Sequence, residues 1–557
     1  MPYFNAVETI TMFNREVKMS KELHFQSDAQ SKLLHGATLL TNAVKITLGP
    51  KSKSVLIEKK WGKPIICNDG VTIAKEIDLR DPIENMGAQM LKEVAELTGD
   101  SVGDGTSTAT ILAHAILSEG IKNITAGASA IDLKHGLDRG LKVVIETIRS
   151  LSKKITTRQE MEQVATISAH NDLSIGKFVA DAIDKVGKDG IVTVEEARGT
   201  ETIVEVVNGM QFDRGYLSPY FVTDTIKMET KLENPLILIY DKKIGSIEPI
   251  VPVLERIIKS GQPLLIIAED IEGEALAMLV VNKIRSTLSC AAVKCPGYGE
   301  PRKEMLQDIA ILTGGQVITE DLGMTLEKLQ MEQLGHAAHV IVGKEHTTII
   351  GGAGDKNAIE DRIEQLKMRI EKNKNAFVQE KLGERLGKLV GGVAVIRVGA
   401  PSEAELKSKK EALDDGIAAT KAAVAEGIVP GAGLSLIRSI LALEKEEINV
   451  TGDEKTGIQI LKHALEAPTR QIAENSGDDP GVVVNEMKKG NGNYGYDAAK
   501  RAYVDLVESG IIDPTKVVRV ALENAVSVAS VLLLTQATLS EILEDKKTEN
   551  NIPGAAH

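Results

Sequence analysis

Residues 263–282, PLLIIAEDIEGEALAMLVVN, join a short apolar run to a helical pattern. Residues 264–268 are all apolar, which is typical of a strand buried on both faces. After an acidic turn, Leu276, Val280 and Ile284 recur at the spacing of one helical face. A buried strand followed by such a helix is the repeating unit of α/β sheets, so this stretch predicts an α/β fold around it.

The same pattern continues on both sides of this stretch and then stops. Short apolar runs lie at 236–239, 291–293 and 393–398, with helical segments between them. By contrast, residues 28–150 and 430–541 have the long apolar periodicity of helices. The economical interpretation is an α/β domain inserted into a discontinuous helical domain. Gly209 and Gly392 mark the two joins, where glycine favours a turn or, alternatively, a hinge.

The composition limits the classes of protein to which the chain can belong. It has 557 residues, 43% of them apolar, and a formal net charge of −13. We therefore expect a large globular protein that binds neither nucleic acid nor an anionic membrane. The chain lacks a run of about 18 consecutive apolar residues, so we expect no transmembrane helix. Cys67, Cys290 and Cys295 are too few for a disulfide framework and predict a cytoplasmic protein.

The two ends of the chain differ in composition from the rest. Residues 1–18 contain Glu8 and Glu16 and lack an apolar segment, so they predict a short N-terminal extension and not a secretory signal. Residues 542–557 are polar and contain glycine and proline, which predicts a flexible tail.

Residues 103–110, GDGTSTAT, are the strongest candidate for a phosphate site. Two glycines permit close approach of a ligand, and the following hydroxyls and N–H groups would begin a helix. Asp104 could hold Mg²⁺ there, although an ordinary N-cap after a glycine turn has the same pattern. The usual phosphate-loop motif is absent, since residues 383–388, GERLGK, are one residue short. Gly490, Gly492 and Gly495 match a dinucleotide pattern but follow a helix-like segment.

Other candidate residues are ambiguous when they are considered singly. Residues 47–50, TLGP, read as a helix stop, and Asp69 reads as a turn residue. Asp415 points away from the apolar stripe of its predicted helix, 402–425. It is either solvated or delivered to a site elsewhere. Predicted helices 249–259 and 274–285 carry apolar stripes that face a core or form a binding surface.

Taken in order, these segments resemble the GroEL family of group I chaperonins over about residues 19–541. The shared motifs are TLGPK (47–51), NDGVTIAKEI (68–77), ENMGAQM (84–90), GDGTSTAT (103–110), GMQFDRGYLSPYF (209–221), PLLIIAEDIEGEALAMLVVN (263–282), MLQDIAILTGG (305–315), GGVAVI (391–396), NYGY (493–496) and IIDPTKV (511–517).

The resemblance implies a multidomain fold. An all-α equatorial domain would comprise 19–150 and 426–541, and an α+β intermediate domain 151–207 and 394–425. An α/β apical domain, 208–393, would be inserted between them. The implied function is ATP-dependent protein folding, in which an ATPase with Mg²⁺ and K⁺ captures non-native clients and encapsulates them. The implied partners are further copies of the chain, in stacked seven-membered rings, and a GroES-type co-chaperonin.

The resemblance also implies roles for individual residues. Asp69 and Asp415 would be catalytic, and Asp104 would bind Mg²⁺. Nucleotide contacts would come from Thr47, Leu48, Gly49, Pro50, Asp104, Gly105, Thr106, Ser107, Thr108, Ala432, Asp497, Ala498, Ala499 and Asp513. Clients and the co-chaperonin would contact Tyr216, Tyr220, Phe221, Val251, Leu254, Leu276, Val280 and Val281. Gly209 and Gly392 would be hinges, and Arg470 and Asp479 would act between rings.

The chain also departs from the family pattern. Asn68 replaces a lysine near the phosphates, Ser52 and Ala432 replace glycines, and Asp497 replaces an asparagine. Ser107 for threonine is a mild change, and the Gly-Gly-Met tail is missing. An alternative function is therefore a divergent holdase or scaffold that binds apolar segments but cycles ATP weakly.

Overall fold

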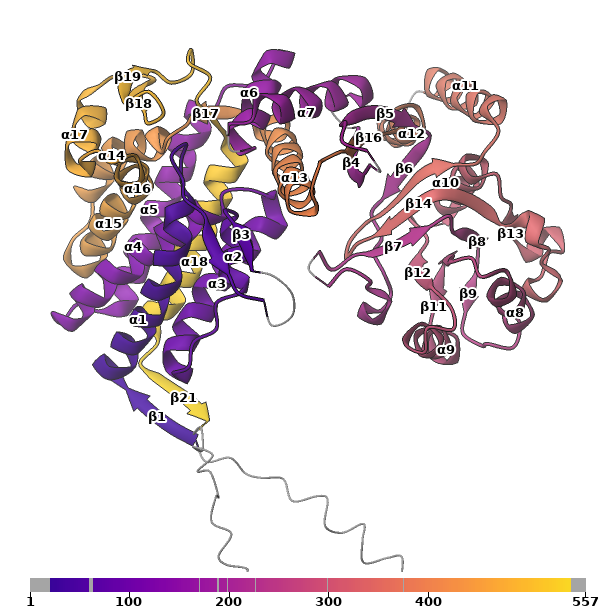
Figure 1. Cartoon of the computed structure of the whole chain (residues 1–557), viewed down its shortest axis with the longest axis horizontal. Helices are drawn as coiled ribbons and strands as arrows, with labels where there is room; N and C mark the ends of the chain where they lie inside the picture. Colours follow the sequence, from indigo (N-terminus) through magenta and orange to yellow (C-terminus); the bar gives the residue numbers. More distant parts are fainter. Residues whose placement is uncertain are drawn as a thin grey trace, which may run out of the picture. The chain divides into compact units, whose positions relative to one another are not determined.

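The computed structural model describes residues 21–541 except 60–63, 170, 188–189, 198, 226, 298 and 374. The predicted extension, 1–18, and the predicted tail, 542–557, lie outside the described residues. The chain forms two compact units, one from residues up to Leu173 together with those from Ala418 onward, and one from Ser174–Ile417. The helix-rich flanks and the inserted α/β block are thus observed (Figure 1).

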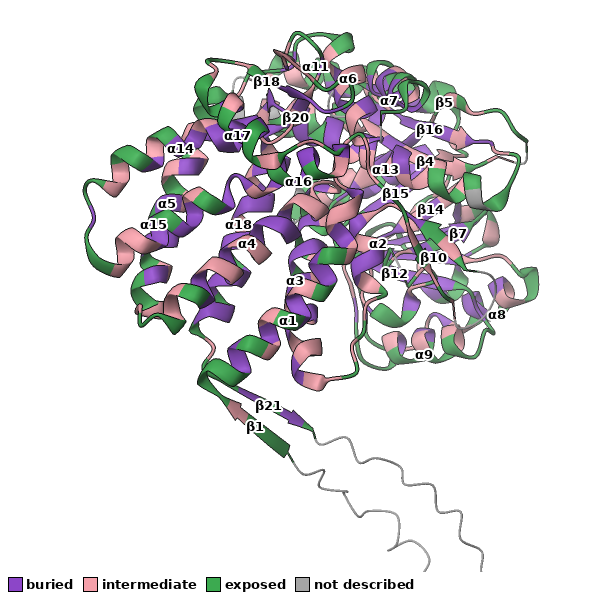
Figure 2. Cartoon of the chain, turned by 60° about the vertical axis from the view of Figure 1, so that its left-hand side comes forward, coloured by how far each residue is buried: buried purple, intermediate pink, exposed green. Residues whose placement is uncertain are grey.

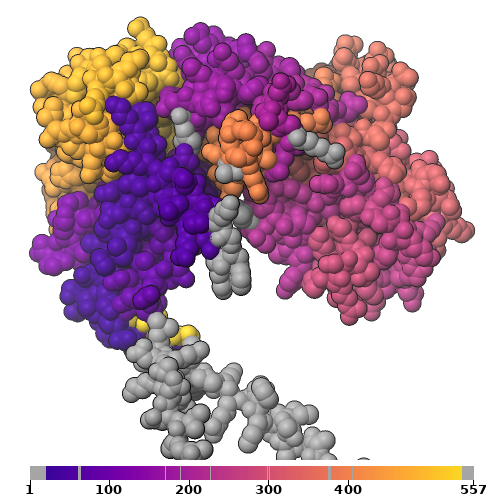
Figure 3. Space-filling model, in the orientation of Figure 1, coloured from indigo at the N-terminus to yellow at the C-terminus, as the bar shows by residue number. Residues whose placement is uncertain are grey.

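The first unit is built on long helices from both ends of the chain. Its core combines α1 (Gln26–Val44), α3 (Pro82–Val102), α4 (Thr106–Thr125), α5 (Ala130–Leu151) and α18 (Thr515–Leu534). Helices α14 (Leu434–Glu447) and α15 (Gly452–Ala464) pack on α5. The N-terminal and C-terminal segments therefore share one surface (Figure 3).

Glycines permit the closest helix packing in this unit. A Cβ atom at Gly36 of α1 would lie 1.7 Å from the Glu84 carbonyl oxygen of α3. A Cβ atom at Gly87 of α3 would lie 2.0 Å from the Leu33 carbonyl oxygen of α1. Because the two backbones touch, only glycine fits at either position. Asp81 caps α3 through the Ile83 and Glu84 N–H groups, which sets where this helix begins.

Helix α18 bears on the expectation that the chain has no transmembrane helix. Among the described residues, it alone is long and apolar enough to cross a membrane, with a mean hydropathy of 1.8. Its most apolar window is 67% buried, and it packs against α3, α4 and α5 (Figure 2). It is a core helix of the first unit, and its apolar character follows from burial on most of its faces.

Short elements complete the first unit. Four antiparallel ribbons pair β1 (Lys21–Phe25) with β21 (Ala537–Glu541), β2 (Val55–Ile57) with β3 (Ile65–Cys67), β17 (Ile428–Pro430) with β20 (Ile512–Pro514), and β18 (Tyr494–Asp497) with β19 (Ala502–Asp505). The remaining helices are η1 (Lys45–Thr47), α2 (Gly70–Lys75), α6 (Arg158–Ser168), α16 (Ala467–Ser476) and α17 (Pro480–Lys489). The sequence patterns predicted the long helices but not these ribbons.

The second unit contains an eight-stranded mixed sheet. Its parallel part joins β8 (Leu236–Tyr240), β10 (Leu264–Ala268), β12 (Cys290–Lys294) and β13 (Val317–Ile318). Its antiparallel part joins β6 (Gly209–Phe212), β7 (Thr230–Glu233), β14 (Gly335–Val342) and β15 (Thr347–Gly352). Helices α8 (Val251–Ser260), α9 (Gly273–Ile284) and α10 (Gly299–Thr313) follow successive parallel strands. Residues 263–282 form β10 and most of α9, as predicted.

A smaller, three-stranded sheet lies in the same unit, in the order β4 (Ile191–Glu196), β16 (Val393–Val398), β5 (Ile203–Val207). Helices α7 (Leu173–Val186), α11 (Lys356–Lys372), α12 (Ala376–Val390) and α13 (Glu403–Glu426) belong to this part of the chain. The boundary between the units falls at 173/174 and 417/418, inside the segments that we assigned to an intermediate domain. One reason is that α6 packs on β20 of the first unit. The three-domain division remains a prediction.

Candidate functional site

The candidate nucleotide residues of the first unit come from segments far apart in the sequence, and the structure brings them together. Leu48, Ala432 and Ala498 contribute to one apolar cluster. The Asn475 side-chain amide donates to the Lys45 and Leu48 carbonyl oxygens at 2.9 and 2.8 Å, and so fixes the chain that leads into residues 47–50. Residues near 48, 432, 475 and 498 therefore surround one region.

Asp104 occupies the turn between two long helices. Gly103, at the end of α3, has φ of +70°, and Gly105, the N-cap of α4, has φ of +79°. A carboxylate oxygen of Asp104 accepts from the Gly105 N–H at 2.5 Å, and the other accepts from the Ser168 hydroxyl at 2.6 Å. The carboxylate thus lies at the positive end of the 20-residue helix α4, beside N–H groups suited to phosphate.

Asp69 lies on a second helix start beside the same turn. It caps α2, accepting from the Val71 and Thr72 N–H groups at 3.3 and 2.8 Å. The next residue, Gly70, packs so closely on α4 that a Cβ atom would lie 2.3 Å from the Ser107 hydroxyl oxygen. Ser107 is in turn 3.0 Å from the Thr47 hydroxyl. The structure therefore assembles Thr47, Asp69 and Ser107, all predicted site residues, around the start of α4.

Asp513 contributes a carboxyl group whose pKa is raised, so that it is a weaker acid than usual. It lies on β20 opposite Val429 of β17. Burial raises the pKa of Asp513 to about 7, and the negative charge of Asp104 adds to the shift. Two carboxyl groups that repel each other inside a protein favour a cation between them.

The metal-ligating capacity of this region is limited. In the part of the chain that the structure describes, no group of three or more His, Cys, Asp or Glu side chains could hold a metal ion. Mg²⁺, however, is usually held by one or two carboxylates together with substrate phosphates and water. Asp104, at the start of α4, fits that chemistry.

The loop after β17 has strained geometry. Ala432, where the resemblance implies a glycine, has a left-handed φ of +54°. Its carbonyl oxygen accepts from the Thr469 hydroxyl at 2.9 Å, which helps to hold the loop in place. Alanine therefore holds a backbone conformation here that glycine adopts at a lower energetic cost.

Asp497, at the end of β18, has its charge partly compensated. Its carboxylate accepts from the Ala499 and Lys500 N–H groups at 3.0 and 3.1 Å. The Lys500 ammonium lies 3.3 Å from the same carboxylate. The negative charge of Asp497 is thus stabilised by local donors.

Asp415 belongs to the other unit, on the part of α13 that precedes Ile417. It is half-buried, while Leu413 and Ile417 on the same helix are buried. The sequence therefore predicted correctly that it lies off the packed stripe.

The predicted client-binding residues divide by exposure. Phe221 and Leu254 lie in the core of the eight-stranded sheet, with exposed fractions of 0% and 5%. The half-buried members are Tyr216, Val251, Leu276 and Val280. Tyr220 and Val281 are exposed. Direct client contact by Phe221 and Leu254 is therefore incompatible with this packing.

Two exposed residues of α9 were not among the predicted contacts. Met278 and Ile284 join Val281 on one helical face, spaced three residues apart. The stripe seen in the sequence, which contains Leu276, Val280 and Ile284, lies on a neighbouring face of the helix. The sequence alone does not show which face of α9 the sheet covers. The exposed face is the better candidate for binding apolar segments.

The candidate hinge glycines lie at the two crossings between the sheets of the second unit. Gly392 has φ of +60°, and a Cβ atom there would lie 2.7 Å from the Val207 carbonyl oxygen. At Gly209 a Cβ atom would lie 2.6 Å from a Val393 methyl group. The two crossings are therefore adjacent, and both require glycine in this conformation.

Arg470 and Asp479 each have a partner within the first unit. Arg470 pairs with Glu466 at 2.6 Å, and Asp479 caps α17 through the Gly481 and Val482 N–H groups. Neither contact tests a role between rings.

Comparison with known proteins identifies the class to which this arrangement belongs. The sequence model of the TCP-1/cpn60 chaperonin family matches residues 40–542, and the chain belongs to that family. Chaperonin GroEL 5 of Bradyrhizobium diazoefficiens is 62% identical to it over 527 residues, which are 95% of this chain and 97% of that protein.

These matches confirm the resemblance to group I chaperonins and make the chain a GroEL paralogue. Its function is ATP-dependent protein folding, and its enzymatic activity is ATP hydrolysis. The passive holdase is not favoured by this degree of identity. Chaperonins of this family form oligomeric rings, bind ATP with Mg²⁺, and work with co-chaperonins on client proteins.

Proposed function

We propose that ATP binds at the start of α4 and that Asp104 holds its Mg²⁺, which would neutralise phosphate charge. The geometry of Asp104, between two left-handed glycines at a helix start, carries this proposal. Thr47–Pro50 and Gly105–Thr108 would contact the phosphates. Ala432, Asp497, Ala498, Ala499 and Asp513 would surround the base and ribose, with K⁺ as a second cation.

We further propose that Asp69 and Asp415 position the attacking water. Phosphoryl transfer depends mainly on positioning of the reactants and on charge neutralisation. Two carboxylates that position the water would therefore supply the positioning that the reaction needs from the protein. Because Asp415 belongs to the second unit, hydrolysis would require that unit to approach the nucleotide. The adjacent segments 207–209 and 390–393, which contain Gly209 and Gly392, would act as hinges and let the eight-stranded sheet move relative to the three-stranded sheet.

Steady-state ATP hydrolysis with Mg²⁺ tests the site. Asp415→Ala is expected to lower kcat by at least about a hundredfold while ATP still binds, because it removes a group that acts only on the reacting water. Asp104→Ala is expected to weaken Mg²⁺-dependent binding as well. Equal turnover by wild type and Asp415→Ala would refute the catalytic assignment.

We propose that the chain assembles into seven-membered rings that stack in pairs, with Arg470 and Asp479 between rings and a GroES-type co-chaperonin as the cap. Exposed apolar side chains on two ribbons support self-association. Leu56 lies opposite Ile66 in the β2–β3 ribbon, with exposed fractions of 68% and 76%. Leu23 lies opposite Leu539 in the β1–β21 ribbon, and both are also exposed. Exposed ribbon edges with apolar faces favour pairing with another chain.

We propose that clients bind the exposed apolar face of α9, together with Tyr220, in the cytoplasm. Burial of apolar surface is non-directional, so such a face can hold many unfolded sequences. The second unit would thus capture clients and the first would bind ATP.

A further inference from the structure

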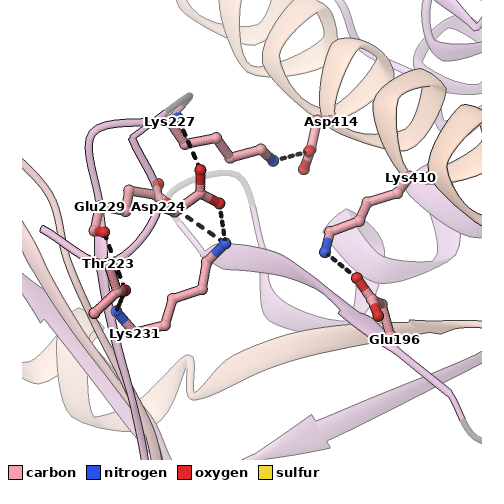
Figure 4. Close-up of polar contacts among 8 residues, drawn as sticks. All are labelled: Glu196, Thr223, Asp224, Lys227, Glu229, Lys231, Lys410 and Asp414. Atoms are coloured by element: carbon pink, nitrogen blue, oxygen red, sulfur yellow. Dashed lines mark hydrogen bonds and ion pairs between the residues drawn. The ribbon is translucent and has the colours of Figure 1, made fainter. Parts of the chain in front are cut away.

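An ion pair joins the eight-stranded sheet to α13 within the second unit. Lys227 lies in the turn between Asp224 and Glu229, just before β7, and its ammonium donates to a carboxylate oxygen of Asp414 (Figure 4). Asp414 immediately precedes Asp415 on the same helix. The contact therefore connects the sheet to the turn of α13 that carries a proposed catalytic carboxylate.

Hydrogen bonds close the base of the turn that carries Lys227. Asp224 and Glu229 exchange backbone hydrogen bonds of 2.9 and 3.1 Å, and Met228 adopts a left-handed φ of +51°. The Asp224 carboxylate accepts from the Lys227 N–H at 3.1 Å and from the Lys231 ammonium at 2.8 Å (Figure 4). Because the base of the turn is fixed in this way, Lys227 loses less freedom on pairing than a lysine on a loose loop.

A second ion pair holds α13 one turn earlier. The Lys410 ammonium donates to a Glu196 carboxylate oxygen at 2.8 Å, at the end of β4 (Figure 4). This hydrogen bond lowers the pKa of Glu196. Lys410 and Asp414 are four residues apart and therefore share one face of α13. The helix is thus tied to the three-stranded sheet at Lys410 and to the eight-stranded sheet at Asp414.

The pair also changes the charge beside Asp415. Two adjacent carboxylates would repel each other and oppose approach to anionic phosphates. Burial alone would lower the pKa of the Lys227 ammonium, but its attraction to Asp414 outweighs burial, and the pKa lies above its usual value. Lys227 therefore stays charged and compensates the charge of Asp414, which lies next to Asp415 in the sequence.

We propose that Lys227 is a positioning residue for ATP hydrolysis, which anchors and neutralises Asp414 so that Asp415 can approach the nucleotide. This inference rests on the proposed catalytic role of Asp415. It makes Lys227 a direct link between the sheet that carries the proposed client-binding helix and the helix that carries Asp415. Lys227 itself would not contact ATP.

A double-mutant cycle on the full chain, with steady-state ATP hydrolysis as the readout, tests the proposal. Lys227→Met is expected to lower kcat about two- to fivefold with KM for ATP unchanged, the size expected of a partly exposed ion pair. Lys227→Arg should retain activity. In an Asp414→Asn background, Lys227→Met should have no further effect, because the charge that it compensates is gone. The exchange of the two residues, Lys227→Asp with Asp414→Lys, should restore most of the turnover.

Lys407→Met is the matched control, because it removes an exposed lysine of α13 whose partner Glu411 is 3.9 Å away on the same helix. It should leave kcat unchanged. The proposal is overturned if Lys227→Met leaves kcat unchanged, raises it, or lowers it equally in the Asp414→Asn background. Asp415→Ala in the same assay separates the two ideas: if that variant turns over normally, the proposed function fails. If that variant is inactive while Lys227→Met is neutral, only the positioning role fails.

Discussion

Ala432 stores strain in the loop that we place at the nucleotide. A left-handed backbone costs an alanine roughly 1–2 kcal/mol relative to glycine. We therefore expect Ala432→Gly to raise the free energy of unfolding by about 0.5–1 kcal/mol, after its larger unfolded-state entropy is counted. Chemical denaturation without nucleotide would measure the change.

Gly433 provides the contrast at the next position. It has φ of +73°, and a Cβ atom there would lie 2.4 Å from the Thr469 hydroxyl oxygen. Gly433→Ala should therefore destabilise the first unit, whereas Ala432→Gly stabilises it. If both substitutions destabilise equally, the loop is not strained at Ala432.

His114 makes the stability of the first unit depend on pH. Burial lowers the pKa of His114 to about 4, and the positive charges of Lys45 and Lys122 contribute. Its Nε2–H donates to the Thr38 hydroxyl oxygen at 2.9 Å, because that hydroxyl donates to the Leu34 carbonyl oxygen. The folded chain thus holds His114 neutral, whereas the unfolded chain protonates it near pH 6.5.

It follows that stability is unaffected by His114 above about pH 6.5 and falls as the pH drops from there to about 4. We expect a loss of about 2–3 kcal/mol over this window. Denaturation of wild type and His114→Gln at pH 7 and pH 4.5 would measure it, since the variant lacks this titration. Parallel losses in both proteins would assign the acid sensitivity to other groups.

At the scale of elements, the exposed face of α9 is the proposed client-binding surface, and its effect can be distinguished from that of buried core residues. Met278 and Val281 are 42% and 39% exposed, so Met278→Ser with Val281→Ser should weaken capture of an unfolded client severalfold and leave the fold intact. Capture of a fluorescently labelled, chemically unfolded protein would measure this. Leu254→Ser is the core contrast, and we expect it to lower the free energy of unfolding by about 2–5 kcal/mol. Undiminished capture by the α9 variant would assign client binding to another surface.

The elements also mark where prediction from the sequence ends. The run 264–268 predicted β10 because a strand buried on both faces is apolar at every position. The stripe that includes Leu254 left open whether it faces a core or forms a binding surface, because a helical stripe does not reveal which neighbour covers it; the structure buries Leu254. The ribbon of β1 and β21 joins residues more than 500 positions apart, and no local pattern encodes such a pairing.

At the scale of the whole molecule, motifs in the sequence indicated candidate residues such as Asp69, Asp104 and Asp513, but they could not indicate which contacts bring these residues together. The contacts that hold the site together come from residues that no motif includes, such as Asn475, which holds residues 45 and 48, and Ser168, which donates to Asp104. These are long-range hydrogen bonds, and each depends on the packing of helices that a single segment does not determine.

Assembly provides the test at this largest scale. Leu56 and Ile66 directly oppose each other on the exposed face of the β2–β3 ribbon, so a neighbouring chain would cover them together. Burial of two such side chains contributes about 1.5–3 kcal/mol each. Because charges cannot be buried there without a partner, Leu56→Glu with Ile66→Glu should shift the native mass from oligomer to monomer. Leu322→Glu, which charges an equally exposed leucine of the second unit, should leave the mass unchanged. If the doubly charged variant still forms full rings with ATP, this ribbon lies outside the interface and the chain must associate through another surface.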